Sequence, residues 1–174
     1  FLTRVRSEQL RDVGATMTPF NAFLFLTGLE TLALRMRQHV QNARQVAEFL
    51  GAHPRVEWVA YSGLPDSPWY DRARHYLPEG PGAVFAFGVS GGREGGARFI
   101  DSCRLASHLA NIGDARTLVI HPASTTHQQL SDDALRAAGI GADLVRISVG
   151  LEDAEDICED LDAALQASAG RSAT

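Results

Sequence analysis

Four short apolar runs most constrain the fold of this chain, because each has the length and composition of a buried β-strand. They are VEWVAYSGL (56–64), which leaves into a loop, AVFAFGVS (83–90), TLVI (117–120) and LVRISVG (144–150). Short runs rich in β-branched and aromatic residues and bounded by turn residues are typical of strands. Segments with helical periodicity separate most of these runs, and this alternation indicates an α/β domain.

Two amphipathic helices flank the strand region. Residues 30–50 carry apolar residues at a period of 3.6, with Gly51 expected just beyond the helix end. The helix at 151–165 has an apolar stripe made of Ala154, Ile157, Cys158, Leu161 and Leu165. We expect one sheet with helices on one face, and mixed, mainly antiparallel strands, because some connections are too short for a parallel crossover.

The first thirty residues form a helical arm in this interpretation. A charged helix covers 1–13 and ends near Gly14, and Thr18 is a plausible N-cap for the next helix, with Pro19 at its first position. Phe20, Phe23 and Leu24 form an apolar face on that helix.

Composition excludes several classes of function. A chain of 174 residues with 45% apolar and 21% charged residues suits one compact domain with an appended arm. The net charge of −5, without a basic patch, argues against a nucleic-acid partner. No apolar run approaches the length of a membrane span. Cys103 and Cys158 fit neither a zinc pattern nor a disulfide framework, so we expect reduced thiols in a cytoplasmic protein.

The chain contains no lysine, since all 16 basic residues are arginines. It therefore cannot form a Schiff base through its own side chains or complete a Walker A loop. The glycine-rich stretch GVSGGREGG (88–96) matches neither common phosphate-binding pattern, and a flexible turn between strand and helix is the better interpretation.

The stretch NIGDARTLVIHPASTTH (111–127) is the least generic part of the sequence. His121 and His127 lack a metal-ligand spacing, and no metal site is expected. Ser124 and its two threonine neighbours lack the glycine-flanked elbow of a hydrolase nucleophile. The two histidines are expected to brace the loop. The other four histidines are interpreted as surface or structural residues: His39, His53, His75 and His108.

Arg146 is the charged residue inside the apolar run LVRISVG. Burying a guanidinium is costly unless it meets an anion. Three explanations for an arginine at this position remain open. It can form a structural ion pair, face water from an edge strand, or bind a carboxylate or phosphate of a ligand.

Several long motifs, in order and at matching spacing, resemble the C-terminal part of the Cys/Met-metabolism family of pyridoxal-phosphate enzymes. The resemblance covers residue 1 to about 167 and rests on LRDVGATMTPFNAFLFLTGLETLALRMRQHVQNA, VEWVAYSGL, NIGDARTLVIHPASTTHQQL and LVRISVGLEDAEDI. It implies the C-terminal domain of the aspartate-aminotransferase-like fold. The TPFNAFL and NIGDA versions are most similar to the O-acetylhomoserine sulfhydrylase branch.

The resemblance also implies roles for three residues in binding an amino-acid substrate. Arg146 matches the arginine that pairs with the substrate α-carboxylate. Asn111 falls where many relatives have a serine that contacts the same carboxylate, and the backbone contact can survive this difference. Thr126 matches a threonine near that carboxylate. The resemblance places the cofactor lysine and the other ligands of pyridoxal 5'-phosphate outside this chain, so no catalytic or cofactor-binding residue is expected here.

The implied parent protein is a transferase that replaces the acetyl group of O-acetylhomoserine by sulfide, giving homocysteine for methionine biosynthesis. It is expected to be a cytoplasmic homotetramer, with no membrane or nucleic-acid partner, and this chain alone is expected to be inactive. The alternatives are a cystathionine γ-synthase or methionine γ-lyase relative, or a free-standing amino-acid-binding module. The expected parts are an arm (1–30) packing on a cofactor domain, a bridging helix (31–52), an α/β domain (53–168) and a disordered tail (169–174).

Overall fold

The computed structural model describes residues 1–168. The chain divides into two compact units, the first from Phe1 to Arg35 and the second from Met36 onward. The tail at 169–174, expected to be disordered, lies outside the described residues. The domain boundaries expected from the sequence stay predictions.

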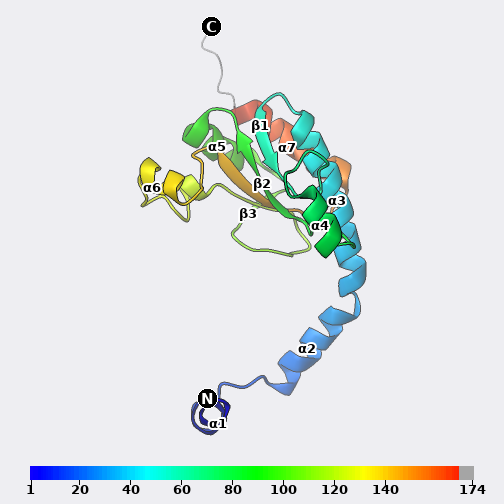
Figure 1. Ribbon diagram of the computed structural model, residues 1–174, viewed down its shortest axis with the longest axis vertical. Coiled ribbons are helices and arrows are strands. Elements are labelled where there is room, and N and C mark those ends of the chain that lie inside the picture. The colour runs from blue at the N-terminus through cyan, green and yellow to red at the C-terminus, as the bar shows by residue number, and fades with distance from the viewer. Residues whose placement is uncertain (169–174) are drawn as a thin grey trace. The chain divides into compact units, whose positions relative to one another are not determined.

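The first unit is helical (Figure 1). Its elements are α1 (Leu2–Arg4), the π-helix η1 (Val5–Val13) and α2 (Pro19–Glu30). The side chain of Thr18 accepts a hydrogen bond from the backbone N–H of Asn21 at 3.1 Å, which confirms the expected N-cap of α2. No helix in the described part of the chain is both long and apolar enough to cross a membrane.

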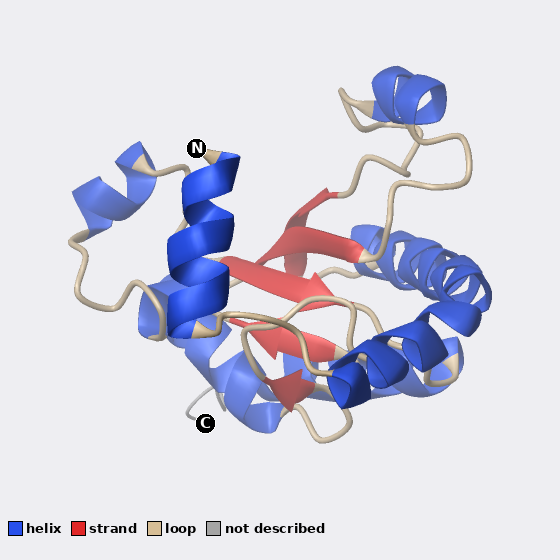
Figure 2. Ribbon diagram, turned by 90° about the horizontal axis from the view of Figure 1, so that it is seen from below, coloured by secondary structure: helices blue, strands red, loops and turns tan. Residues whose placement is uncertain are grey.

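Five strands form one sheet among the described residues, in the order β1-β2-β5-β4-β3 (Figure 2). Their bounds are β1 (Val56–Ala60), β2 (Val84–Val89), β3 (Ser107–His108), β4 (Leu118–Ile120) and β5 (Leu144–Ser148). Only the edge pair β3–β4 is parallel, while β1–β2, β2–β5 and β5–β4 are antiparallel. The expected mixed, mainly antiparallel sheet is thus confirmed, and β5 lies at its centre.

The helices that accompany the sheet begin with the long α3. In chain order they are α3 (Leu32–Ala52), α4 (Tyr70–Tyr76), α5 (Gly92–Ser102), the short 3₁₀-helix η2 (Pro122–Ser124), α6 (Asp132–Ala137) and α7 (Ala154–Ser168). Ser131 caps α6, since its hydroxyl accepts from the N–H of Ala134 at 3.3 Å.

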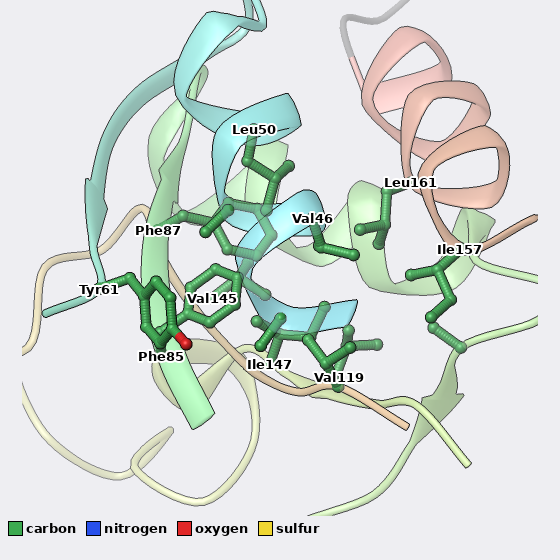
Figure 3. Packing of buried hydrophobic residues seen from close by; sticks show 14 of the residues in the cluster. Val46, Leu50, Tyr61, Phe85, Phe87, Val119, Val145, Ile147, Ile157 and Leu161 are labelled. Atoms are coloured by element: carbon green, nitrogen blue, oxygen red, sulfur yellow. The ribbon is translucent and has the colours of Figure 1, made fainter. Parts of the chain in front are cut away.

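The core lies where α3, α5 and α7 pack against one face of the sheet. Figure 3 shows side chains of α3 and α7 directed toward side chains of the strands, and the labelled residues are Val46, Leu50, Tyr61, Phe85, Phe87, Val119, Val145, Ile147, Ile157 and Leu161. Phe87 and Phe99 meet edge to face, with ring centroids 5.7 Å apart. Burial of these apolar side chains is the main stabilising contribution to the second unit.

One local expectation was wrong, and two features differ from the sequence pattern in detail. Gly51 lies inside α3 rather than beyond it. The turn expected between strand and helix in the glycine-rich stretch is present but short, because it comprises only Ser90 and Gly91, while Gly92 begins α5 and Gly95 and Gly96 lie within that helix. The edge strand β3 was not expected, because two polar residues carry no strand pattern.

A tryptophan on β1 links that strand to the segment that precedes β5. The indole N–H of Trp58 donates to a carboxylate oxygen of Asp143 at 2.7 Å. Gly88 leaves the space for this bond, because a Cβ there would lie 2.2 Å from the indole nitrogen and 2.4 Å from the carboxylate. Trp58 remains 36% exposed.

Candidate substrate-carboxylate site

Arg146 occupies the middle of β5, the central strand. Its neighbours Val145 and Ile147 are fully buried in the core. Successive side chains of a strand point to opposite faces, so Arg146 lies on the face away from that core. It is half-buried there, paired in register with Ala86 of β2 and Ile120 of β4. Because β5 is the central strand, the alternative of an edge position for Arg146 is excluded.

The guanidinium of Arg146 is held by a neutral group. Its Nη2 donates to the backbone carbonyl of Asn111 at 3.3 Å. Among the described residues, no carboxylate forms an ion pair with Arg146, so the structural ion pair considered above is not present there. A guanidinium has five N–H donors in a planar fork, and most of them remain available to an anion.

The turn that supplies this carbonyl is fixed by β5 itself. The N–H of Gly113 donates to the hydroxyl of the buried Ser148 at 3.2 Å, and the side-chain oxygen of Asn111 accepts from the N–H of Ile112 at 2.9 Å. Gly113 has a φ of 75°, a conformation that favours glycine. Arg146 and Ser148 thus hold the turn from the same face of one strand.

Asp114, the acidic residue of this turn, is occupied by a different arginine. The backbone N–H of Arg116 and then its guanidinium hold the pKa of the Asp114 carboxyl below its usual range. Asp114 therefore stays charged and paired with Arg116, which leaves Arg146 without a competing carboxylate from this turn.

The structure does not connect Thr126 with the other two candidate residues by any hydrogen bond among the described residues. Its exposed hydroxyl lies 2.9 Å from Nδ1 of the neighbouring His127. The N–H of His127 donates to the carbonyl of Pro122 at 2.9 Å. The loop is thus ordered by local bonds, and a role for Thr126 near the carboxylate stays a prediction.

His121 is the anchor of that loop. Its ring is fully buried, and Nε2 lies 2.8 Å from the carbonyl oxygen of Ala142. Because a carbonyl only accepts, Nε2 carries the hydrogen, and Nδ1 accepts from the hydroxyl of Ser124 at 2.8 Å. Burial lowers the pKa of His121, which favours this neutral form. The expectation that His121 braces the loop agrees with these contacts.

Gly96 of α5 makes room for the His121 ring, a role that the sequence did not reveal. A Cβ at position 96 would lie 2.4 Å from Nε2 and 2.5 Å from Cδ2 of His121. The glycine-rich stretch 88–96 thus includes a packing site for this histidine. One turn earlier, a guanidinium nitrogen of Arg93 donates to the carbonyl of Ala123 in η2.

Two polar side chains of α3 hold the segment that follows β5. Nδ1 of the buried His39 lies 2.8 Å from the carbonyl oxygen of Val149. The amide of Asn42 donates to the carbonyls of Gly150 and Glu152 at 3.1 and 2.8 Å. The sequence carried only a weak signal for the buried position of His39: this residue lies one helical turn after Met36, on the apolar stripe of the helix.

The residues of this chain do not supply a covalent attachment for pyridoxal phosphate, because the chain has no lysine. What the arrangement offers is an anion site: a guanidinium held by β5 and by a fixed turn, beside a loop braced by a buried histidine.

Among curated proteins, the chain is similar to sulfhydrylases and homocysteine synthases. O-acetyl-L-homoserine sulfhydrylase 1 of Thermus thermophilus is 50% identical over 165 residues, which are 95% of this chain and 39% of that protein. Homocysteine synthase of Schizosaccharomyces pombe is 49% identical over 161 residues, 92% of this chain and 38% of that protein. The chain therefore spans about 39% of the length of these relatives.

A solved structure has the same fold. It is described as an O-acetylhomoserine (thiol)-lyase from Campylobacter jejuni and contains N'-pyridoxyl-lysine-5'-monophosphate. It matches with a TM-score of 0.84 and 41% identity, over 94% of this chain and 39% of that one. The family model described as "Cys/Met metabolism PLP-dependent enzyme" matches residues 3–166. Nearly the whole chain is covered, so it belongs to the Cys/Met metabolism family of pyridoxal-phosphate-dependent enzymes.

Proposed function

We propose that this chain is the substrate-carboxylate domain of an O-acetylhomoserine sulfhydrylase, a transferase that converts O-acetylhomoserine and sulfide to homocysteine and acetate. The observation that carries the proposal is the Arg146 guanidinium, which lies on the central strand and has a backbone carbonyl as its partner. The names of the relatives support the choice of substrate.

Arg146 binds the α-carboxylate of the amino-acid substrate in this proposal. A bidentate pair with a carboxylate fixes orientation as well as position. The carbonyl of Asn111 holds the fork from one side, so the contribution of Asn111 is to orient Arg146 through its backbone rather than through its side chain. Thr126 contributes a hydroxyl on the loop that His121 braces.

The chemistry at the γ-carbon depends on pyridoxal phosphate as the electron sink, which other residues of the protein must hold. The task of this chain is positioning: a substrate fixed at its carboxylate loses less entropy on reaching the transition state. Assembly as a homotetramer and a cytoplasmic location are part of the proposal, and the family resemblance supports them.

The test is Arg146→Ala in the protein that carries this chain. Loss of a charge-assisted pair costs roughly 1.5–3 kcal/mol, so KM for O-acetylhomoserine should rise about 10- to 150-fold. Arg146→Lys should restore only part of this, because an ammonium cannot form the bidentate pair. Arg104→Ala, which removes an exposed guanidinium elsewhere, is the matched control. An unchanged KM in Arg146→Ala would refute the assignment.

Parallel assays with methionine and with cysteine as substrates separate the sulfhydrylase from a γ-lyase or a cystathionine γ-synthase. A protein that binds amino acids but turns over none of these substrates would support the non-catalytic module instead.

A further inference from the structure

A cavity of about 370 Å³ opens beside the Arg146 site. It lies between α3, the approach to β2, the turn after Asn111 and the end of β5. Its lining is mostly apolar and comprises Met36, His39, residues 81–84, Ile112, Gly113 and Ser148. All of these residues belong to the second compact unit.

His39 brings an unused hydrogen-bond acceptor to this cavity. Nδ1 lies 2.8 Å from the carbonyl oxygen of Val149, so Nδ1 carries the hydrogen and, in the neutral ring, Nε2 is an acceptor. Nε2 has no hydrogen-bond partner among the described residues, although His39 is only 3% exposed. Among the described residues, every side-chain nitrogen that is fully shielded from solvent has a hydrogen-bond partner. Nε2 of His39 has none, so this atom must be accessible from the cavity that His39 lines.

The cavity lies beside the turn that holds Arg146. The carbonyl that holds Arg146 belongs to Asn111, and the next two residues of the turn line the cavity. Ser148 lines it as well, and lies on the same face of β5 as Arg146, roughly 7 Å along the strand. The carboxylate site and the cavity therefore share one turn and one face of β5.

We propose that this cavity binds the sulfur nucleophile, with Nε2 of His39 accepting the hydrogen of its S–H group. This inference rests on the proposed function, because it names the site of the second substrate of that reaction. Hydrogen sulfide is a weakly polar S–H donor, which suits an apolar cavity with a single acceptor.

The same contact places His39 to activate the nucleophile, because the deprotonated sulfur is the reactive form. The S–H bond breaks and an Nε2–H bond forms, while the electron pair stays on sulfur as hydrosulfide. The resulting imidazolium keeps its Nδ1–H bond to the carbonyl of Val149.

Two variants of the cofactor-loaded protein separate this role from a structural one. His39→Asn places an amide N–H near the position of Nδ1, so it retains a donor to Val149 and loses the acceptor. We expect its KM for sulfide to rise roughly 5- to 15-fold, the effect of one lost hydrogen bond, with KM for O-acetylhomoserine unchanged. His39→Gln places an acceptor near Nε2 but loses the Val149 bond, so its melting temperature should fall while KM for sulfide stays within about threefold of the original.

The outcomes are distinct. An original protein that makes no homocysteine from O-acetylhomoserine and sulfide overturns the proposed function itself. If the original protein is active and His39→Asn keeps a normal KM for sulfide, only the sulfide site is overturned. An equal rise in the KM values for sulfide and for O-acetylhomoserine in His39→Asn overturns it as well. If His39→Asn does not fold, a KM for sulfide in His39→Gln within about threefold of the original supports the site, and a larger rise overturns it.

Discussion

The packing of Gly96 against His121 allows a quantitative test, because a single added methyl group must displace a fully buried ring. In Gly96→Ala the new Cβ would lie 2.4 Å from Nε2 of His121, well inside contact distance. Overpacking of this kind costs about 1–3 kcal/mol, and each hydrogen bond that the shifted ring loses costs about 0.5–1.5 kcal/mol. The two bonds at risk reach Ala142 and Ser124.

One effect acts in the other direction. Position 96 lies inside α5, where alanine is about 1 kcal/mol more favourable than glycine. If both bonds are lost, the net destabilisation is therefore about 1–5 kcal/mol, which corresponds to a fall in Tm of roughly 2–20 °C for a chain of this size. Urea and thermal unfolding followed by circular dichroism measure both quantities.

The matched control is Gly51→Ala, since that glycine lies in α3 with no atom within 4 Å of an added Cβ. Here only helix propensity changes, and stability should rise by a few tenths to about 1 kcal/mol. A double-mutant cycle then isolates the contact: with His121→Ala already present, Gly96→Ala should raise stability by a few tenths to about 1 kcal/mol, as Gly51→Ala does. Equal stability of the two single glycine variants would refute the assigned contact.

Two further predictions concern titratable groups. Burial lowers the pKa of His121, so the unfolded chain binds this proton more readily than the folded chain, and the free energy of unfolding should fall as pH drops below the ordinary histidine value of about 6.5. In His121→Asn the slope of unfolding free energy against pH should flatten in that range. An unchanged slope would contradict the neutral, buried form. Burial, with a smaller contribution from Asp160, raises the pKa of Cys103 to about 12. Its thiol should therefore resist iodoacetamide at neutral pH until the protein is unfolded. Rapid alkylation of Cys103 in the folded protein, detected by mass spectrometry, would contradict this prediction.

Much of the sheet was predictable from the sequence, because buried strands need continuous apolar runs. The edge strand β3 was not, since its two residues pair through backbone atoms and its side chains carry no pattern. Gly51 was misplaced because glycine signals a helix end only statistically, and α3 continues past it for one more residue.

The candidate site was predictable only in part. A charged residue in an apolar run marked Arg146 from the sequence alone. The use of the Asn111 carbonyl rather than its side chain, and the space that Gly96 leaves for His121, depend on contacts between distant segments. His39 was interpreted as surface or structural, and only the bond to Val149 shows which ring nitrogen remains open.

The bond between Trp58 and Asp143 gives the second unit a built-in optical probe. Indole emission depends on the polarity and hydrogen bonding around the ring, and here the ring is tied to the segment that leads directly into the strand of Arg146. Fluorescence of Trp58, isolated by replacing Trp69 on its exposed loop with phenylalanine, would therefore report on the integrity of the central strands without any label. The same signal would follow ligand binding at the far end of β5 only if that strand shifts as a unit.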